Sequence, residues 1–477
     1  MKHQIIVLII VSFLFSCARE PDNHQRTIIT GQIENPISDN IGILVFDDMI
    51  TRDNSKLSTT VDDSGNFKLE FSIQEPQKVF LSRPRSNNLL FLYPGDSLSI
   101  SFDDKDVRRT LSFDGSSANQ NHYLSTFNMN YDMGNFFMKM RDLPPAEFKK
   151  LVLANRNDAL DAFNAFELKN ELDETFRQFA LAQINYQFYS MLFMCESMQK
   201  HMYGGDADSL GFTDEYFDFI VEADFHNDGA LINADDYLTA LSSYILYKVG
   251  TSESYQEHLE KAYRFANENL EDKTREHFQA RLISYMIERT NSIDSTLVND
   301  FLGQCESEKV REIVSTLYEK HINISSMQGS SLPDEILMSS LYNRDGGKIT
   351  FRELLNKQSG KLVFLDIWSL GCKPCLDEMS YSRGLIEKYA DEDISFIFLS
   401  TDEMTDMWDK GIEMSGIYEG HYRLVGSFQS ALLKQLNIKA IPRYIFLDKE
   451  GKILDVDAKR PRSKALIEEI DKQLSSK

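Results

Sequence analysis

The feature that most constrains the fold lies in the C-terminal third of the chain, where an apolar segment is followed at once by two cysteines. Residues 361–368 (KLVFLDIW) are almost continuously apolar, which is typical of a strand buried on both faces of a sheet. Cys372 and Cys375 follow, separated by two residues, and the segment from Cys375 to Tyr389 has a helical pattern. A C-x-x-C pair between a buried strand and a helix indicates a redox site.

The rest of the C-terminal region alternates between strand-like and helical segments. We expect further strands at 394–400, 443–447 and 453–456, helices at 405–414, 428–436 and 463–474, and a hairpin made of 336–341 and 348–351. Such alternation is typical of a βαβ core. Residues 330–477 are therefore predicted to form an α/β domain.

The expected position of the cysteines suggests how they react. Cys372 is placed at the N-terminus of a helix, where unpaired backbone N–H groups and the helix dipole stabilise a thiolate. Lys373 adds a nearby positive charge, and Cys375 can reach back to resolve a mixed disulfide. Because the cysteines themselves carry the electrons, no cofactor is expected. No second C-x-x-C accompanies them, so we predict no metal site.

The residues around this pair resemble the thioredoxin superfamily, specifically its membrane-tethered TlpA/ResA-like redoxins. The family's W-x-x-x-C-x-x-C-x-x-E pattern is matched by Trp368, Cys372, Cys375 and Glu378. Downstream, residues 436–453 are similar to the segment around the family's cis-proline, with Pro442 at that position. The resemblance covers about 330–477 and implies a thioredoxin-like fold with a redox-active disulfide between Cys372 and Cys375.

The resemblance also implies roles for individual side chains near the disulfide. Trp368, Ile441 and Pro442 would contribute to substrate binding, with Ile441 offering its backbone to the substrate. Asp366 falls where thioredoxins place a buried acid that could accept the proton of Cys375. Glu378 is a second candidate for that duty. The alternative for Glu378 is a solvated residue of the first helical turn that interacts with the helix dipole.

The N-terminus has the pattern of a targeting segment. Residues 5–15 (IIVLIIVSFLF) are too few to span the ~30 Å apolar core of a bilayer and match the apolar part of a signal peptide. They run into Leu14-Phe15-Ser16-Cys17, which resembles a bacterial lipobox. That resemblance implies a signal peptide at 1–16, lipidation of Cys17, a tether at 17–26 and a periplasmic, membrane-anchored protein. The alternative is an ordinary signal peptide followed by an incidental cysteine.

Two further regions separate the tether from the redox region. Residues 27–113 alternate apolar and polar side chains between turns, which predicts a β-sandwich, and 114–329 predict a central all-α helical layer. Within that layer, the acidic stretch 201–250 is interpreted as a solvated helical face. Cys195 and Cys305 are expected on core-facing helix stripes, and whether they pair stays open. The layout resembles that of periplasmic lipoproteins with an N-terminal β domain.

Together these patterns predict a membrane-anchored extracytoplasmic thiol–disulfide oxidoreductase. Its partners would be exported protein thiols and disulfides and a membrane-bound electron donor or acceptor, and the resemblance implies roles in cell redox homeostasis and cytochrome c maturation. A formal net charge of −23 argues against nucleic acid as a partner. One alternative is a ligand- or protein-binding lipoprotein with an accessory redoxin domain. A thiol peroxidase is less favoured, because Leu365 and Ser369 replace the Pro and Thr of the peroxiredoxin P-x-x-x-T-x-x-C pattern.

Overall fold

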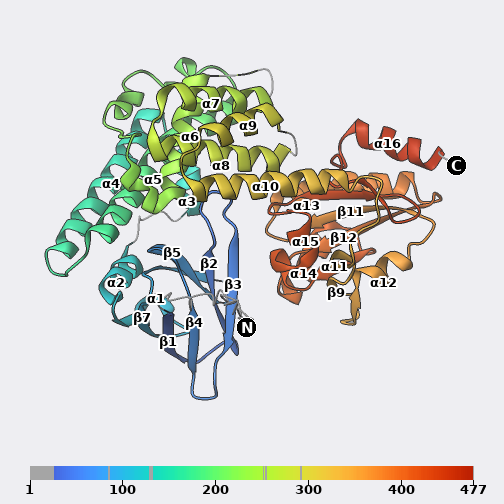
Figure 1. The fold of residues 1–477 in the computed structure, drawn as a ribbon, viewed down its shortest axis with the longest axis horizontal. Coiled ribbons are helices and arrows are strands. Elements are labelled where there is room, and N and C mark those ends of the chain that lie inside the picture. Colours follow the sequence, from blue (N-terminus) through green and yellow to red (C-terminus); the bar gives the residue numbers. More distant parts are fainter. Residues whose placement is uncertain are drawn as a thin grey trace, which may run out of the picture. The chain divides into compact units, whose positions relative to one another are not determined.

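The computed structural model describes residues 26–83, 86–127, 133–250, 252, 255–290 and 293–475 (Figure 1). Within these residues the chain divides into two compact units, one made of 26–45, 57–127 and 163–177 and the other of 46–56, 133–162 and 178–475. The predicted signal peptide, the lipidation site Cys17 and the predicted tether up to residue 25 lie outside the described residues. No described helix is both long enough and apolar enough to cross a membrane.

The N-terminal region consists of two four-stranded sheets. The first has the order β4-β1-β7-β8 and contains β1 (Thr27–Glu34), β4 (Asn66–Phe71), β7 (Ser97–Asp103) and β8 (Ser112–Gly115), with the short helix α1 (Val107–Thr110) between the last two. The second has the order β3-β2-β5-β6 and contains β2 (Asn40–Phe46), β3 (Asn54–Thr60), β5 (Gln77–Arg83) and β6 (Ser86–Leu92). Alternate residues of β4 (Phe67, Leu69 and Phe71) are buried in one core with Ile43 and Val79 of the other sheet. The predicted β-sandwich fold is confirmed.

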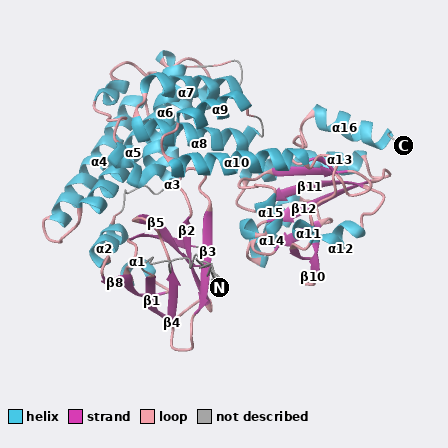
Figure 2. Cartoon of the chain, viewed as in Figure 1, coloured by secondary structure: helices cyan, strands magenta, loops and turns pink. Residues whose placement is uncertain are grey.

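The central region is helical, as the sequence predicts (Figure 2). Its α-helices are α2 (Ala118–Thr126), α3 (Met133–Asp142), α4 (Pro145–Glu167), α5 (Glu174–Tyr203), α6 (Ala234–Val249), α7 (Tyr255–Asn269), α8 (Asp272–Thr290), α9 (Ser295–Gln304) and α10 (Glu308–Ser326). Cys195 and Cys305 are buried in a shared core rich in aromatic rings. Both are free thiols, so no disulfide joins them.

The acidic stretch does not form the predicted helical face. Most of it lies in turns and three short 3-10 helices, η1 (Asp208–Leu210), η2 (Tyr216–Val221) and η3 (Asp228–Asn233). Gly204, Gly205 and Gly211 have φ of 68°, 91° and 87°, values that side-chain-bearing residues rarely adopt. The glycines therefore interrupt the helix that the acidic pattern suggested.

The C-terminal region is an α/β domain built on one seven-stranded sheet of order β10-β9-β13-β12-β11-β14-β15. Its strands are β9 (Ser340–Tyr342), β10 (Lys348–Thr350), β11 (Leu362–Trp368), β12 (Ile394–Ser400), β13 (His421–Leu424), β14 (Arg443–Leu447) and β15 (Ile453–Asp455). Its helices are α11 (Asp334–Leu337), α12 (Phe351–Asn356), α13 (Lys373–Lys388), α14 (Thr405–Ser415), α15 (Ala431–Gln435) and α16 (Lys464–Ser475). The interior strand β11 is fully buried, parallel to β12 and antiparallel to β14.

The two faces of this sheet are covered by different helices. On one face, Val363, Leu365 and Ile367 of β11 pack with residues of α11, α12 and α15. On the other face, the alternate residues Phe364 and Trp368 pack with α13, α14 and α16. Because side chains of a strand alternate between faces, Asp366 belongs to the second face, beneath the helix that carries Cys375.

Two of the differences from the sequence-based expectation concern strands of this sheet. The predicted strand 336–341 begins as a helix, since Asp334–Leu337 forms α11 directly after Pro333, and β9 starts only at Ser340. The short strand β13, which pairs parallel to β12, was not predicted at all. Its four residues are too few to show a recognisable period.

Candidate redox site

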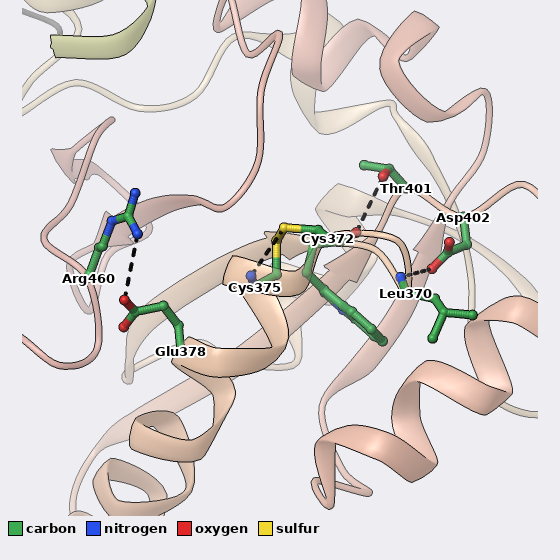
Figure 3. Close-up of a disulfide and its surroundings, with 8 residues drawn as sticks. Leu370, Cys372, Cys375, Glu378, Thr401, Asp402 and Arg460 are labelled. Atoms are coloured by element: carbon green, nitrogen blue, oxygen red, sulfur yellow. Dashed lines mark hydrogen bonds and ion pairs between the residues drawn. A yellow bond between two sulfur atoms is a disulfide. The ribbon is translucent and has the colours of Figure 1, made fainter. Parts of the chain in front are cut away.

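The two cysteines of the C-x-x-C motif form a disulfide where β11 is connected to α13, with their Cα atoms 5.2 Å apart (Figure 3). Cys372 is the N-cap of α13, and its Sγ accepts the backbone N–H of Cys375 at 3.2 Å. Pro374 occupies the first turn, where its missing N–H leaves no hydrogen bond unmade. Cys375 is fully buried, whereas Cys372 is half-buried. Cys372 is thus the sulfur that a partner molecule can reach.

The loop between β11 and Cys372 is fixed by the residues that end β12. The N–H of Leu370 donates to Oδ2 of Asp402 at 3.0 Å (Figure 3). The N–H of Thr401 donates to the carbonyl of Trp368 at 2.8 Å. Ser400 donates its hydroxyl to the same Asp402 oxygen at 2.8 Å. Sequence reasoning missed these residues. The signal was the polar run Ser-Thr-Asp at the end of a buried strand, beside the strand that precedes the cysteines.

A compact apolar cluster supports the disulfide from the interior. It contains Trp368, Cys375, Met379, Phe398, Trp408, Ile412 and Ile417. Trp368 has no exposed surface, so its ring packs beneath the disulfide and offers no surface for a substrate to contact. Gly411 of α14 lies so close to this ring that an added Cβ would be only 2.7 Å from it.

The predicted substrate segment comes to the edge of the same cluster. The Ile441–Pro442 peptide bond is cis, and it directly precedes β14. The Ile441 side chain is half-buried and packs against the apolar cluster, as does Cys372. The fold therefore brings Ile441 and the reachable cysteine to one small area, although they are far apart in the sequence.

Asp366 lies beneath α13 without a polar partner. It is 1% exposed, and neither carboxylate oxygen has a hydrogen-bond partner among the described residues. Tyr444 of β14 stands directly opposite in the sheet register, and its buried hydroxyl is likewise without a described partner. Burial raises the pKa of Asp366 well above its ordinary value, and the charge of Glu378 raises it further. Asp366 therefore holds its proton at pH values where an ordinary aspartate is ionised.

Glu378 is buried but, unlike Asp366, it is paired. Its carboxylate accepts the backbone N–H of Arg462 at 3.2 Å and the Nε of the same residue, and Nη1 of Arg460 lies 3.7 Å away (Figure 3). The alternative of a solvated first-turn residue is wrong, because Glu378 has no exposed surface. Three residues after Cys375, it falls on the same buried face of α13.

The positive charge next to the reactive cysteine is engaged elsewhere. Lys373 is 83% exposed and forms an ion pair with Asp377, one helical turn further along α13, at 2.7 Å. Asp377 therefore offsets much of the charge that the sequence assigned to stabilising Cys372. The helix N-terminus is left as the main source of positive potential at the Cys372 sulfur.

Comparison with known proteins agrees with this geometry. A family model described as Thioredoxin-like matches residues 360–453. The C-terminal region is a thioredoxin-like domain. The matched range of this domain contains Asp366, the two cysteines, Glu378 and Pro442, but it ends before the arginines that pair with Glu378.

Several relatives of the thioredoxin-like domain are named thiol-disulfide oxidoreductase ResA. The protein from Bacillus thuringiensis subsp. konkukian is 29% identical over 131 residues, which cover 28% of this chain and 71% of the relative. The protein from Geobacillus thermodenitrificans is 29% identical over 125 residues, covering 26% of this chain and 66% of the relative. The solved thioredoxin domain of a thiol-disulfide oxidoreductase from Bacteroides vulgatus is 25% identical, with a TM-score of 0.26, and covers 30% of this chain and 100% of that one.

Proposed function

We propose that this protein is a membrane-anchored, extracytoplasmic enzyme that exchanges disulfides with exported proteins through Cys372 and Cys375. The observation that carries the proposal is the disulfide at the N-terminus of α13, in which one sulfur can be reached and the other is buried. The thioredoxin-like family match and the ResA relatives point to the same chemistry. The protein is thus a thiol–disulfide oxidoreductase of the thioredoxin-like type.

In the proposed exchange, the two sulfurs act in sequence. The Cys372 thiolate attacks a substrate disulfide, which forms a mixed disulfide and releases one substrate thiolate. Cys375 then attacks the Cys372 sulfur, so that the Cys372–Cys375 bond forms and the second substrate thiolate leaves. The free N–H groups at the start of α13 stabilise the thiolate that begins the reaction. The reverse sequence oxidises a substrate, and relative potentials set the direction.

The surrounding residues are assigned supporting roles in the same proposal. Ile441 and Pro442 are placed to contact a substrate bound at Cys372. Asp366 accepts the proton of Cys375, since it is buried and has no other described partner for its oxygens. Trp368 acts indirectly, by supporting the disulfide from below.

The cellular setting in this proposal rests on the sequence. The apolar run 5–15 and the lipobox-like Cys17 support export, lipidation and anchoring in the periplasm. A membrane-bound donor or acceptor would then restore the redox state of the disulfide. We propose that 27–113, 114–329 and 330–477 are separate domains, the first two of which position the thioredoxin-like domain or bind a partner.

Trapping of substrates tests the function directly. In a Cys375→Ser variant, the mixed disulfide at Cys372 cannot be resolved, so adducts with exported proteins should accumulate and be released by reductant. The matched control is Cys372→Ser, which retains the buried cysteine and should trap nothing. If both variants trap equally little and the wild type does not reduce insulin disulfides, the exchange function is wrong and a binding role is favoured.

A further inference from the structure

The loop after β15 carries two arginines that reach an interior carboxylate. The side chains of Arg460 and Arg462 are 53% and 50% exposed, whereas the side chain of Glu378, to which both extend, is 0% exposed. Figure 3 shows Arg460 extending to Glu378. Arg462 contacts Glu378 with both its backbone N–H and its guanidinium, so the loop itself is fixed against the carboxylate. Such pairing raises the pKa of Arg462, and the guanidinium stays charged. Glu378 is therefore a buried anion with dedicated partners.

Glu378 lies in a small group of titratable side chains behind the disulfide. Asp366 of β11 and Tyr444 of β14 belong to the same buried face. Burial raises the pKa of both groups, and the charge of Glu378 raises each further. Strand β12 contributes no titratable group to this face. His421 of β13 is turned to Phe398, with ring centroids 4.8 Å apart, and burial lowers its pKa to about 4.

The remaining charges lie on the solvent side of the pair. Asp377 and Tyr381 of α13 are close to Arg462, and the Tyr381 ring lies 5.5 Å from its guanidinium. Neither has a described contact with Asp366. The two buried acids thus differ in one respect that matters for proton transfer: Glu378 is engaged by cations, whereas Asp366 has no described polar partner.

Building on the proposed function, we propose that Arg462 is a positioning residue for the redox pair. It holds Glu378 as a charged carboxylate and thereby leaves Asp366 as the group that takes the proton of Cys375. A carboxylate whose oxygens already accept N–H groups is a poor proton acceptor. The fixed charge of Glu378 also makes the neighbouring Asp366 a stronger base, because two like charges repel at short range.

The step itself is balanced without any further reactant. Ionised Asp366 takes the proton from the Cys375 thiol, and the freed electron pair of that sulfur forms the bond to Cys372. The bond between Cys372 and the substrate sulfur breaks, and the substrate leaves as a thiolate. If the Arg462 side chain is removed, Glu378 keeps only Arg460, whose Nη1 lies 3.7 Å away, as a cationic partner. The less compensated Glu378 then no longer presents a full fixed charge to Asp366, which becomes a weaker base.

The pH dependence of the resolving step tests this role in the full-length protein. Reduced protein is mixed with 5,5′-dithiobis(2-nitrobenzoate), which places thionitrobenzoate on Cys372, and stopped-flow absorbance follows the second thionitrobenzoate that Cys375 releases. Arg462→Gln should move the pH of half-maximal release rate downward by about one unit, the scale of coupling between neighbouring carboxyl groups. Glu378→Gln should give the same shift, and Arg462→Lys should restore the wild-type profile.

Matched variants separate this role from simple stabilisation. Arg352→Gln removes another arginine of the domain. Arg352 lies on α12, which covers the opposite face of the sheet from α13, and it pairs with Asp334 at 2.6 Å. This variant should leave the profile unchanged. The Glu378→Gln, Arg462→Gln double variant should match Glu378→Gln alone. This double variant also gives a decisive comparison if Arg462→Gln does not fold, because it contains no uncompensated buried charge.

The outcomes are distinct. An Arg462→Gln profile identical to wild type, an unshifted Glu378→Gln profile, or a double variant that shifts further than Glu378→Gln would each overturn the positioning role. A wild-type protein that never releases the second thionitrobenzoate would instead refute the exchange function on which the role rests.

Discussion

Replacing Gly411 by alanine should destabilise the thioredoxin-like domain, although alanine is the better helix former. The new Cβ would lie 2.7 Å from two ring atoms of Trp368 and 3.5 Å from Cβ of Leu370. Trp368 is fully buried and packs against Cys375, so its ring cannot move without disturbing the support of the disulfide. Overpacking costs about 1–3 kcal/mol, and the helix propensity gained is about 1 kcal/mol. The net loss should therefore reach about 2 kcal/mol.

Gly384 of α13 provides the matched control. It is exposed, and an added Cβ there meets no atom within 4 Å, so Gly384→Ala should stabilise the domain by about 0.5–1 kcal/mol. The two tryptophans of the chain, Trp368 and Trp408, both lie in this domain, so urea unfolding followed by tryptophan fluorescence reports on it selectively. If Gly411→Ala stabilises the protein as much as Gly384→Ala does, the packing argument is refuted.

Three further substitutions test other parts of the domain. The pKa of Asp366 is higher in the folded than in the unfolded protein, so the free energy of unfolding falls as pH rises from the ordinary aspartate pKa towards the raised one. Asp366→Asn should remove this loss, so in urea titrations the variant should be more stable than the wild type at alkaline pH but not at acid pH. If the free energy of unfolding changes with pH equally in both proteins, the prediction is wrong. Asp402→Ala leaves the N–H of Leu370 without its acceptor and should cost about 1–3 kcal/mol, against a smaller loss for Asp402→Asn. Thr350→Ala should cost about 1 kcal/mol by breaking the capping box with Glu353, whereas Thr350→Ser should be nearly neutral. Thermal unfolding compares the two Asp402 variants with each other and the two Thr350 variants with each other. Equal losses within a pair would argue against the hydrogen bond that the pair tests.

The parts of the fold that local pattern determines were predictable from the sequence. The continuous apolar run of β11 and the cysteines that begin α13 each carry a local signal, which predicts an α/β domain with a redox pair, whereas the thioredoxin-like fold was implied by the family resemblance. The burial of Glu378 was not predictable, because its partner Arg462 is 84 residues away along the chain. Similarly, nothing in the sequence near Leu370 shows that its N–H is fixed by Asp402, which lies just after the end of β12. Contacts between distant segments depend on strand order, which periodicity does not encode.

The position of β1 in its sheet has a mechanical consequence. The strand pairs along its length with β4 on one side and, in parallel, with β7 on the other, so it is an interior strand that begins at Thr27. A pull exerted on the chain from the side of residue 26 acts along the axis of this strand. The hydrogen bonds of both ladders would then be loaded together in shear rather than broken one after another. The sandwich is therefore arranged to withstand tension arriving from a segment that precedes it.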